Sequence, residues 1–456
     1  MSNDFIPHPD CPDWRNLGPN DDEAMIRLMG DAVRADADER PEQWRRGFTR
    51  RQLLAGGLGL GVAALGAQLV TTRVSYAQAA DDAEAGGTRR TLVVVFLRGG
   101  MDGLSVLVPA DDPQLVAWRP DIAVRPGNLM RMDERFGLHP ALGALKPMID
   151  RGRVAAVPDI ATPQLTRSHF QAQDCLERGG SGGASSRGWL DRVLEASGEG
   201  TTFRSMSMTS NLTRSLAGVS HSLVAEQPSD LTFRSPSEWG GATREALSTL
   251  YTGLDHPIAV HARIALDVDA QAATIAASQD ARPDIYPAGE FGQQLRMLST
   301  LIRDDMGVRV ATVDLGGWDM HTGVGDEGSG DMRDMLAALG DGLAAFFTDL
   351  GEKADATTVI LMSEFGRRVN QNASGGVDHG HGGLAIALGA GVRGGVYGDW
   401  RGLDSTMLET GDLPGTNDFR DFLSEVVQGT VGLSSAQASA VFDGWRPTSM
   451  GFLAPV

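Results

Sequence analysis

Cysteine is almost absent from this chain, which has Cys11 and Cys175 in 456 residues. A stretch typical of a cleavable export signal separates the two, so the mature chain would keep Cys175 alone, and a disulfide framework is excluded. Basic residues are also few, with 40 Lys and Arg against 59 Asp and Glu, which gives a formal net charge of −19. This balance argues against nucleic acid and anionic membrane surfaces as partners.

Several short catalytic motifs are missing as well. The sequence has no Gly-x-x-x-x-Gly-Lys-Ser/Thr loop and no His-Glu-x-x-His pair, and no Gly-x-Ser-x-Gly follows a predicted strand. The first absence excludes a P-loop nucleotide site, and the second excludes the helix-borne zinc motif of many metalloproteases. The third argues against the nucleophile turn of ordinary α/β-hydrolases.

An arginine pair, Arg50 and Arg51, comes just before the uncharged stretch 53–70. This stretch is too rich in glycine and too weakly apolar for a permanent anchor, although a transmembrane anchor is the alternative. We interpret residues 1–77 as an N-terminal extension with a twin-arginine signal, cleaved after Ala77 or, as second choice, Ala79. The expected location is the periplasm or another exported site, reached through the twin-arginine translocase, which moves proteins already folded.

Buried-strand patterns alternate with helical patterns along the rest of the chain. The strands are expected at 91–97, 154–160, 308–315, 357–363 and 384–390, and the helices at 140–149, 168–178, 291–303, 332–350 and 418–431. This alternation predicts an α/β fold with a mostly parallel central sheet flanked by helices on both faces. The region from about 180 to 290 breaks the rhythm, and we interpret it as a cap inserted into one domain, 78–456.

Carboxylates and imidazoles gather where the predicted strands end. Side chains at strand ends can converge although they are far apart in sequence. Mixed Asp, Glu and His ligands suit a divalent metal such as zinc, manganese or calcium. A helix cap for a single Asp, or a polar loop at 378–381, is the simpler alternative. The candidate metal ligands are Asp102, Asp319, His321, Glu364, Asp378, His379 and His381.

Hydroxyl groups stand where a helix is expected to begin. Ser168, or else Thr166, could attack a phosphoryl or sulfuryl centre there, because a helix N-terminus favours anions and a metal lowers the pKa of a hydroxyl. A helix N-cap is the alternative for both residues. His169 could be a metal ligand, a proton donor or an ordinary helix residue. Arg98 or Arg367 could hold an anionic group, or could form salt bridges instead.

Six segments together resemble the bacterial domain-of-unknown-function family 1501. They are LRGGMDGL (97–104), TRSHFQAQD (166–174), GGWDMH (316–321), SEFGR (363–367), GVDHGHGG (376–383) and DFRDFLSEVV (418–427). The resemblance extends over about 90–450 and implies membership of the alkaline phosphatase and sulfatase superfamily. That superfamily has a central mixed sheet between helices and an esterase site with one or two metals.

The resemblance also implies roles for single residues. Asp102 matches the first-strand metal aspartate, and Ser168 or Thr166 lies where the nucleophile is expected. The superfamily pattern is altered in three places: Glu364 stands where an Asp-His pair is usual, Asp319 and His321 are closer than usual, and the sulfatase sequence Cys-x-Pro-x-Arg is missing.

Together these patterns predict an exported, metal-dependent hydrolase of a small anionic phosphate or sulfate ester. Two other functions fit the same residues. The chain could be a non-catalytic metal-binding or scaffold protein of the cell envelope, with an envelope protein as its partner. It could also be a calcium-stabilised surface protein, in which chelation unfolds the chain while no ester is cleaved.

Overall fold

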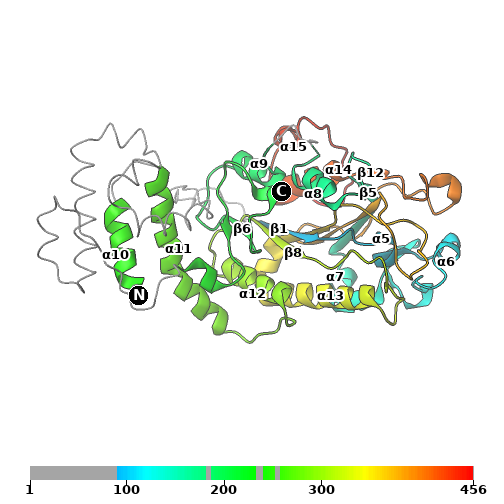
Figure 1. Ribbon diagram of the computed structural model, residues 1–456, viewed down its shortest axis with the longest axis horizontal. Coiled ribbons are helices and arrows are strands. Elements are labelled where there is room, and N and C mark those ends of the chain that lie inside the picture. Colours follow the sequence, from blue (N-terminus) through cyan, green and yellow to red (C-terminus); the bar gives the residue numbers. More distant parts are fainter. Residues whose placement is uncertain (1–89, 181–185, 233–239, 252–256, 455–456) are drawn as a thin grey trace, which may run out of the picture. The chain divides into compact units, whose positions relative to one another are not determined.

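The computed structural model describes residues 90–180, 186–232, 240–251 and 257–454 (Figure 1). The predicted extension and export signal, 1–77, therefore lie outside the described residues. Contacts divide the described residues into two units, one with those between 228 and 277 and a larger one with those between 90 and 227 and between 278 and 454. None of the helices in the described part of the chain is both long and apolar enough to cross a membrane.

The larger unit is built on a mixed sheet of nine strands, in the order β11-β5-β10-β9-β1-β8-β6-β7, with β12 paired to β5. Strand β1 runs parallel to β8 and β9, whereas β10 runs antiparallel to both β9 and β5. The α/β class is thus confirmed. The sheet is mixed, because β10 runs antiparallel to its neighbours while the other strand pairs are parallel. Its strands are β1 (Thr91–Leu97), β5 (Val154–Ala161), β6 (Ser205–Ser207), β7 (Leu223–Val224), β8 (Val310–Leu315), β9 (Thr357–Met362), β10 (Gly383–Gly389), β11 (Gly395–Val396) and β12 (Asn417–Asp418).

The central strand β1 is buried on both faces, which explains its unbroken apolar sequence TLVVVFL. Side chains alternate between the two faces of a strand. Leu92, Val94 and Phe96 accordingly share one face and pack in one core cluster with Trp189 and Phe422 from two of the covering helices. Register is strongly specified in such a strand, because a shift of one residue would exchange the two sets of side chains.

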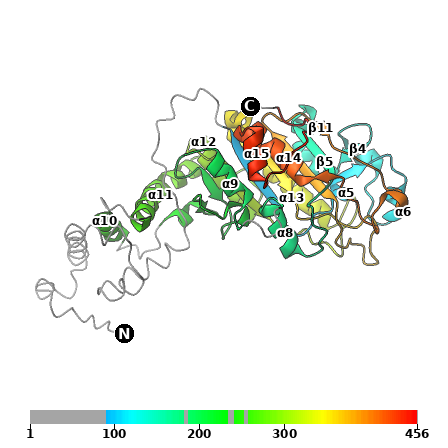
Figure 2. The ribbon, with the colours of Figure 1, turned by 90° about the horizontal axis from the view of Figure 1, so that it is seen from above.

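Helices cover both faces of the sheet, as Figures 1 and 2 show. On one face lie α7 (Lys146–Asp150), α12 (Glu290–Arg303) and α13 (Asp331–Leu350). On the other lie α8 (His169–Glu177), α9 (Trp189–Ala196), α14 (Phe419–Val426) and α15 (Ser435–Val441). Helix α14 continues as a short π-helix, η8 (Val427–Val431), so the expected helix at 418–431 changes its winding near its end.

A small second sheet, in the order β2-β4-β3, lies beyond β1 in the sequence. A separate cluster that includes Leu104, Val108 and Leu403 forms the core of this region. Its elements are α5 (Gly103–Val106), β2 (Leu107–Pro109), α6 (Gln114–Trp118), β3 (Met130–Arg131) and β4 (Phe136–Leu138). Short 3₁₀ segments are η2 (Pro126–Asn128), η3 (Pro140–Leu145), η4 (Arg214–Leu216), η5 (Pro228–Leu231), η6 (Gly351–Ala356) and η7 (Ser405–Met407).

The region interpreted as a cap, about 180–290, is divided in the structure. Its first part belongs to the larger unit, because β6 pairs with β8 and so extends the main sheet. The smaller unit contains α10 (Gly240–Tyr251) and most of α11 (Pro257–Asp280). Within it, the Arg244 guanidinium forms an ion pair with the buried carboxylate of Asp269, which ties α10 to α11.

Candidate functional site

The loops at the strand ends bring three histidines and one aspartate together. His169 begins α8 after β5, Asp319 and His321 follow β8, and His379 precedes β10. The ligand atoms of His169, Asp319 and His379 all lie within 4.8 Å of one another. These side chains are between 20% and 47% exposed, so the cluster is open to a ligand from solvent.

The imidazole nitrogens in this cluster face one another. The Nε2 atom of His379 lies 3.1 Å from Nε2 of His169 and 3.1 Å from Nε2 of His321. The carboxylate of Asp319 completes the group: its Oδ1 lies 3.1 Å from Nε2 of His379 and 3.0 Å from Nε2 of His321. Its Oδ2 lies 3.4 Å from Nε2 of His169.

The hydrogen-bond partners of the three Nδ1 atoms, which lie on the outer side of the cluster, determine which ring nitrogen carries the proton. Nδ1 of His379 lies 2.8 Å from the carbonyl oxygen of Arg167, and a carbonyl can only accept, so this Nδ1 donates. Nδ1 of His169 likewise faces Glu364 at 2.7 Å, and Nδ1 of His321 faces Asp378 at 3.0 Å. In the neutral rings each Nε2 therefore carries no proton, and its lone pair points into the cluster. Adjacent lone pairs repel, and a cation among them would remove that repulsion.

Arg367 holds Asp319 in place. Its Nη2 donates to Oδ1 of Asp319 at 2.7 Å, and its other hydrogen bonds go to backbone carbonyls, among them those of Gly100 and Val377. Burial raises the pKa of Asp319, but its interactions with neighbouring side chains, foremost the hydrogen bond from Arg367, outweigh burial and lower that pKa to about 2. Asp319 is therefore a carboxylate at neutral pH. Because Arg367 is 1% exposed and bound within the protein, it is not presented to an anionic ligand.

Two predicted ligands, Glu364 and Asp378, lie outside the cluster, and each contacts the Nδ1 atom of one of its histidines. Glu364 is 3% exposed and accepts hydrogen bonds from Gln173 at 3.0 Å and from the backbone N–H of Gly99 at 3.0 Å, besides its contact with His169. Burial raises its pKa, but the hydrogen bond from His169 outweighs this and lowers it. Hydrogen bonds from Asn372 and His321 lower the pKa of Asp378. Both carboxylates orient a histidine, as outer partners of metal ligands commonly do.

Asp102 lies in a buried ion pair of its own. Arg119 donates to both carboxylate oxygens, at 2.5 and 2.9 Å, and the Ser105 hydroxyl adds a bond of 2.6 Å. Burial raises the pKa of Asp102, but Arg119 outweighs it, so the pKa is lowered. Arg119 also donates to the carbonyl oxygens of Arg368 and Val369. Through Arg119, Asp102 thus links the loop after β1 to the loop after β9.

His381 points away from the cluster although it is two residues from His379. Its ring lies against Gly415, where an added Cβ would meet Nε2 at 2.8 Å. Burial lowers the pKa of His381. Arg98 is also bound within the protein: it donates to Glu177 at 2.6 Å and to Asp314 at 3.0 Å.

The two candidate nucleophiles differ in their surroundings. The Thr166 hydroxyl donates to Oε1 of Gln171 at 2.8 Å and accepts from the backbone N–H of Ser168 at 3.2 Å. Ser168 is the N-cap residue of α8, but its side chain makes no capping hydrogen bond. The Ser168 hydroxyl, next to His169 in the sequence, is therefore not used as a helix cap.

Sequence reasoning missed the residues that hold the site together. Arg119 and Asn372 lie outside the six segments, and Gln173 lies within 166–174 without having been selected. Each of the three donates to one of the carboxylates Asp102, Glu364 or Asp378. The sequence position of a single Arg, Gln or Asn does not reveal its hydrogen-bond partner, because the tertiary fold determines which distant residue lies beside it. Only the position of Gln173, four residues after His169 on a predicted helix, could have suggested a shared face.

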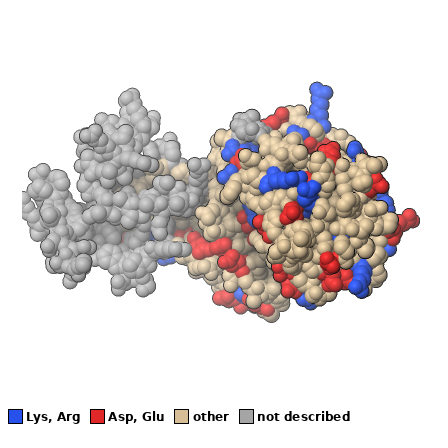
Figure 3. Space-filling view, turned by 45° about the vertical axis from the view of Figure 1, so that its right-hand side comes forward, with Lys and Arg blue, Asp and Glu red and all other residues tan. Residues whose placement is uncertain are grey.

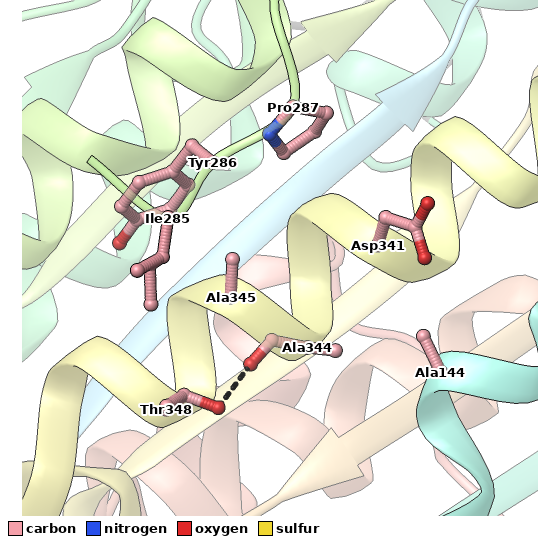
Figure 4. A pocket seen from close by; sticks show the side chains of 8 residues that line it. All are labelled: Ala144, Ile285, Tyr286, Pro287, Asp341, Ala344, Ala345 and Thr348. Carbon is pink, nitrogen blue, oxygen red and sulfur yellow. Dashed lines mark hydrogen bonds between the residues drawn. The ribbon is translucent and has the colours of Figure 1, made fainter. Parts of the chain in front are cut away.

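A second pocket among the described residues of the larger unit lies apart from this cluster. Figure 4 shows a pocket between the segment 285–287 and α13, lined by small or apolar side chains with Asp341 at one end. No predicted site residue lines it. In Figure 3 basic and acidic side chains are interspersed, so the visible face has no broad basic area of the kind that nucleic acid requires.

Residues 128–441 match the family model described as a protein of unknown function, DUF1501. The match covers more than half of the chain, and the chain belongs to this family. The matched region contains all four residues of the cluster, whereas Arg98 and Asp102 precede it. A comparison with curated proteins gave no match.

The buried pair of Asp102 and Arg119 gives a stability prediction. Asp102→Ala should lower the free energy of unfolding by about 3–5 kcal/mol, because it leaves the Arg119 charge buried without its partner. Asp111→Ala is the control, since Asp111 and its partner Arg131 are largely exposed and contribute at most about 1 kcal/mol. Urea denaturation followed by circular dichroism measures both, and equal losses would contradict the assignment.

Asp319 gives a prediction on pH. Its pKa in the folded chain, about 2, lies below the ordinary 3.8, so ionised Asp319 stabilises the fold above about pH 4. That contribution is lost as the pH falls from about 4 to 2. Unfolding of the chelator-treated protein should therefore depend more steeply on pH in this window than unfolding of Asp319→Asn. Parallel curves would show that Arg367 does not stabilise the charged form.

Proposed function

We propose that this chain is an exported, metal-dependent hydrolase of small phosphate or sulfate esters. The observation that carries the proposal is the convergence of Nε2 of His169, His321 and His379 on the Asp319 carboxylate, with the ring protons held on the outer nitrogens. Three lone pairs and a carboxylate directed at one another form a donor set that suits a divalent cation.

The donors favour zinc or manganese over calcium. Calcium takes six to eight oxygen ligands, whereas this cluster is rich in imidazole nitrogen. Ligand atoms around tetrahedral zinc are about 3.3 Å apart, which follows from bonds of about 2.0–2.1 Å. The contacts of 3.1–3.4 Å among His169, His379 and Asp319 fit that spacing. Glu364 and Asp378 would act as outer partners that fix the rings of His169 and His321.

Ser168 is the proposed nucleophile. A bound metal would supply charge stabilisation at the ester's anionic oxygens and lower the pKa of a nearby hydroxyl. The Ser168 hydroxyl would lose its proton and its oxygen would form a bond to phosphorus or sulfur while the bond to the alcohol oxygen breaks. The alcohol oxygen would leave with the electron pair and take up a proton, so that no net proton is gained or lost. Water would then cleave the ester on Ser168. The N-terminus of α8 adds backbone N–H groups that favour the anion.

The proposed location is the periplasm or another exported site. It is supported by the arginine pair and apolar stretch of the N-terminal segment, which would direct the folded chain to the twin-arginine translocase. A small anionic ester is the proposed substrate.

A second function, a non-catalytic metal-binding or scaffold protein of the envelope, is favoured by one specific observation. Arg98 and Arg367, the arginines expected to hold an anionic group, both bind acceptors inside the protein. A phosphatase site without such a clamp would rely on the metal and the helix N-terminus alone to hold its substrate. The metal site is common to both functions, and turnover separates them.

The metal site is tested by elemental analysis of the full chain, purified without chelators. We expect at least one equivalent of zinc or manganese, and its loss in His379→Ala, because Nε2 of His379 touches both other imidazoles and Asp319. His381→Ala is the matched control: it removes an imidazole two positions away that lies outside the cluster. Wild-type protein without metal after reconstitution, or equal loss in both variants, would contradict the site.

The hydrolase is tested with a panel of chromogenic phosphate and sulfate esters in the presence of zinc or manganese. Metal-stimulated turnover is expected, and Ser168→Ala should lower kcat by at least about 100-fold while the metal content stays unchanged. Thr166→Ala is the control and should keep most of the activity. Metal binding without turnover of any ester would favour the scaffold function.

A further inference from the structure

The three histidines of the cluster differ in what holds their outer nitrogens. Nδ1 of His169 and Nδ1 of His321 each face a carboxylate, whereas Nδ1 of His379 donates to the backbone carbonyl oxygen of Arg167 at 2.8 Å. His379 is also the ring whose Nε2 contacts both other imidazoles. The position of this central ring therefore depends on what holds the Arg167 backbone.

The loop between β5 and α8 supplies this carbonyl, and much of its hydrogen bonding is local. The N–H of Thr166 donates to the carbonyl oxygen of Gln164 at 2.9 Å, and the N–H of Ser168 donates to the Thr166 hydroxyl at 3.2 Å. Such local bonds shape a loop but do not fix it against distant parts of the fold. The ion pair of Arg167 with Asp412 does so, because Nη2 and Oδ2 lie 2.6 Å apart although the two residues are 245 positions apart in the chain.

Asp412 is a fixed point for that ion pair. Its side chain is 2% exposed, and its backbone exchanges two hydrogen bonds with Glu409, at 3.0 and 3.1 Å, across a tight turn. The N–H of Val369, in the loop after β9, donates to a carbonyl oxygen of this turn at 3.2 Å. Nε of Arg368 lies 3.6 Å from Oδ1 of Asp412, and that oxygen has no hydrogen-bond partner among the described residues. Arg167 thus donates the hydrogen bond that this buried carboxylate receives.

We propose that Asp412 is a positioning residue of the metal site and acts on His379 through Arg167. This assignment rests on the proposed function, because it requires a metal at the cluster. The contacts run from the buried carboxylate to the Arg167 guanidinium, and from the Arg167 carbonyl oxygen to Nδ1 of His379. A buried carboxylate retains its cation, since breaking the pair leaves a charge without a partner. The carbonyl in turn orients the ring and keeps its proton on Nδ1, so that Nε2 can bind the metal.

The test compares the zinc affinity of four full-length proteins: wild type, Arg167→Ala, Asp412→Ala and the double variant. Zinc is titrated in competition with a chromogenic chelator. Each single substitution should raise the Kd of zinc by about 10- to 100-fold, as the loss of an outer partner of a metal ligand commonly does. The double variant should match the weaker single variant to within about twofold, because both changes break the same link. It leaves neither charge unpaired, so it keeps the test valid where a single variant fails to fold.

Cobalt(II) at saturating concentration gives a readout that a general loss of stability would not move. The visible d–d bands of the bound ion report the arrangement of its ligands. These bands should shift in both single variants while the metal content stays unchanged.

Arg244→Ala is the matched control. Its ion pair with Asp269, in the smaller unit, joins an arginine that is 51% exposed to a carboxylate that is 1% exposed. The corresponding values for Arg167 and Asp412 are 47% and 2%. Arg244→Ala should therefore keep the wild-type cobalt spectrum and the zinc Kd to within about twofold.

Each other outcome contradicts a different part of the proposal. Absence of zinc binding in wild type would overturn the metal site and this inference together. Wild-type binding with an unchanged Kd in the Arg167 and Asp412 variants would overturn this inference alone. A double variant weakened by the product of the two single effects would also overturn it, because independent effects multiply. An equal loss of affinity in Arg244→Ala would do the same, since zinc binding would then follow overall stability.

Discussion

The guanidinium of Arg367 is the constraint on which the candidate site depends. It lies buried among three loops and donates to the carbonyls of Gly100, Trp318 and Val377 as well as to the Asp319 carboxylate. Parallel strands deliver their loops to one edge of a sheet, but nothing in the strands fixes one loop against another. Here the planar guanidinium of Arg367, whose N–H groups point in fixed directions, links the loops to one another. It also gives each of these carbonyl oxygens a hydrogen-bond donor.

The strands were predictable because each carries an unbroken apolar run. Strand β1 occupies the expected residues, and β5 and β9 differ from the expected bounds by one residue at one end. The antiparallel direction of β10 was not predictable, since an apolar run looks the same in either direction. Strands β6 and β7, within the region interpreted as a cap, were not predictable, because they are only three and two residues long and carry no periodic signal.

The site residues show where sequence reasoning stops. The motifs predicted that Asp, Glu and His side chains would gather at strand ends, and His169, Asp319, His321 and His379 do lie together. Residue type alone could not distinguish the side chains that form the cluster from the side chains that position them by hydrogen bonds. That division depends on partners distant in the sequence: Asp102 faces a buried arginine, and Glu364 faces a ring nitrogen.

The spacing of the cluster along the chain has a topological consequence. His169 and His379 are 210 residues apart, and Asp319 is 60 residues from His379. A cation bound there would act as a cross-link between segments that the unfolded chain keeps far apart, and closing such long loops restricts the unfolded ensemble strongly. No short stretch of the chain could assemble this donor set by itself. The ion would therefore be captured only after the sheet has formed, so the metals present where the chain folds would decide which one it carries.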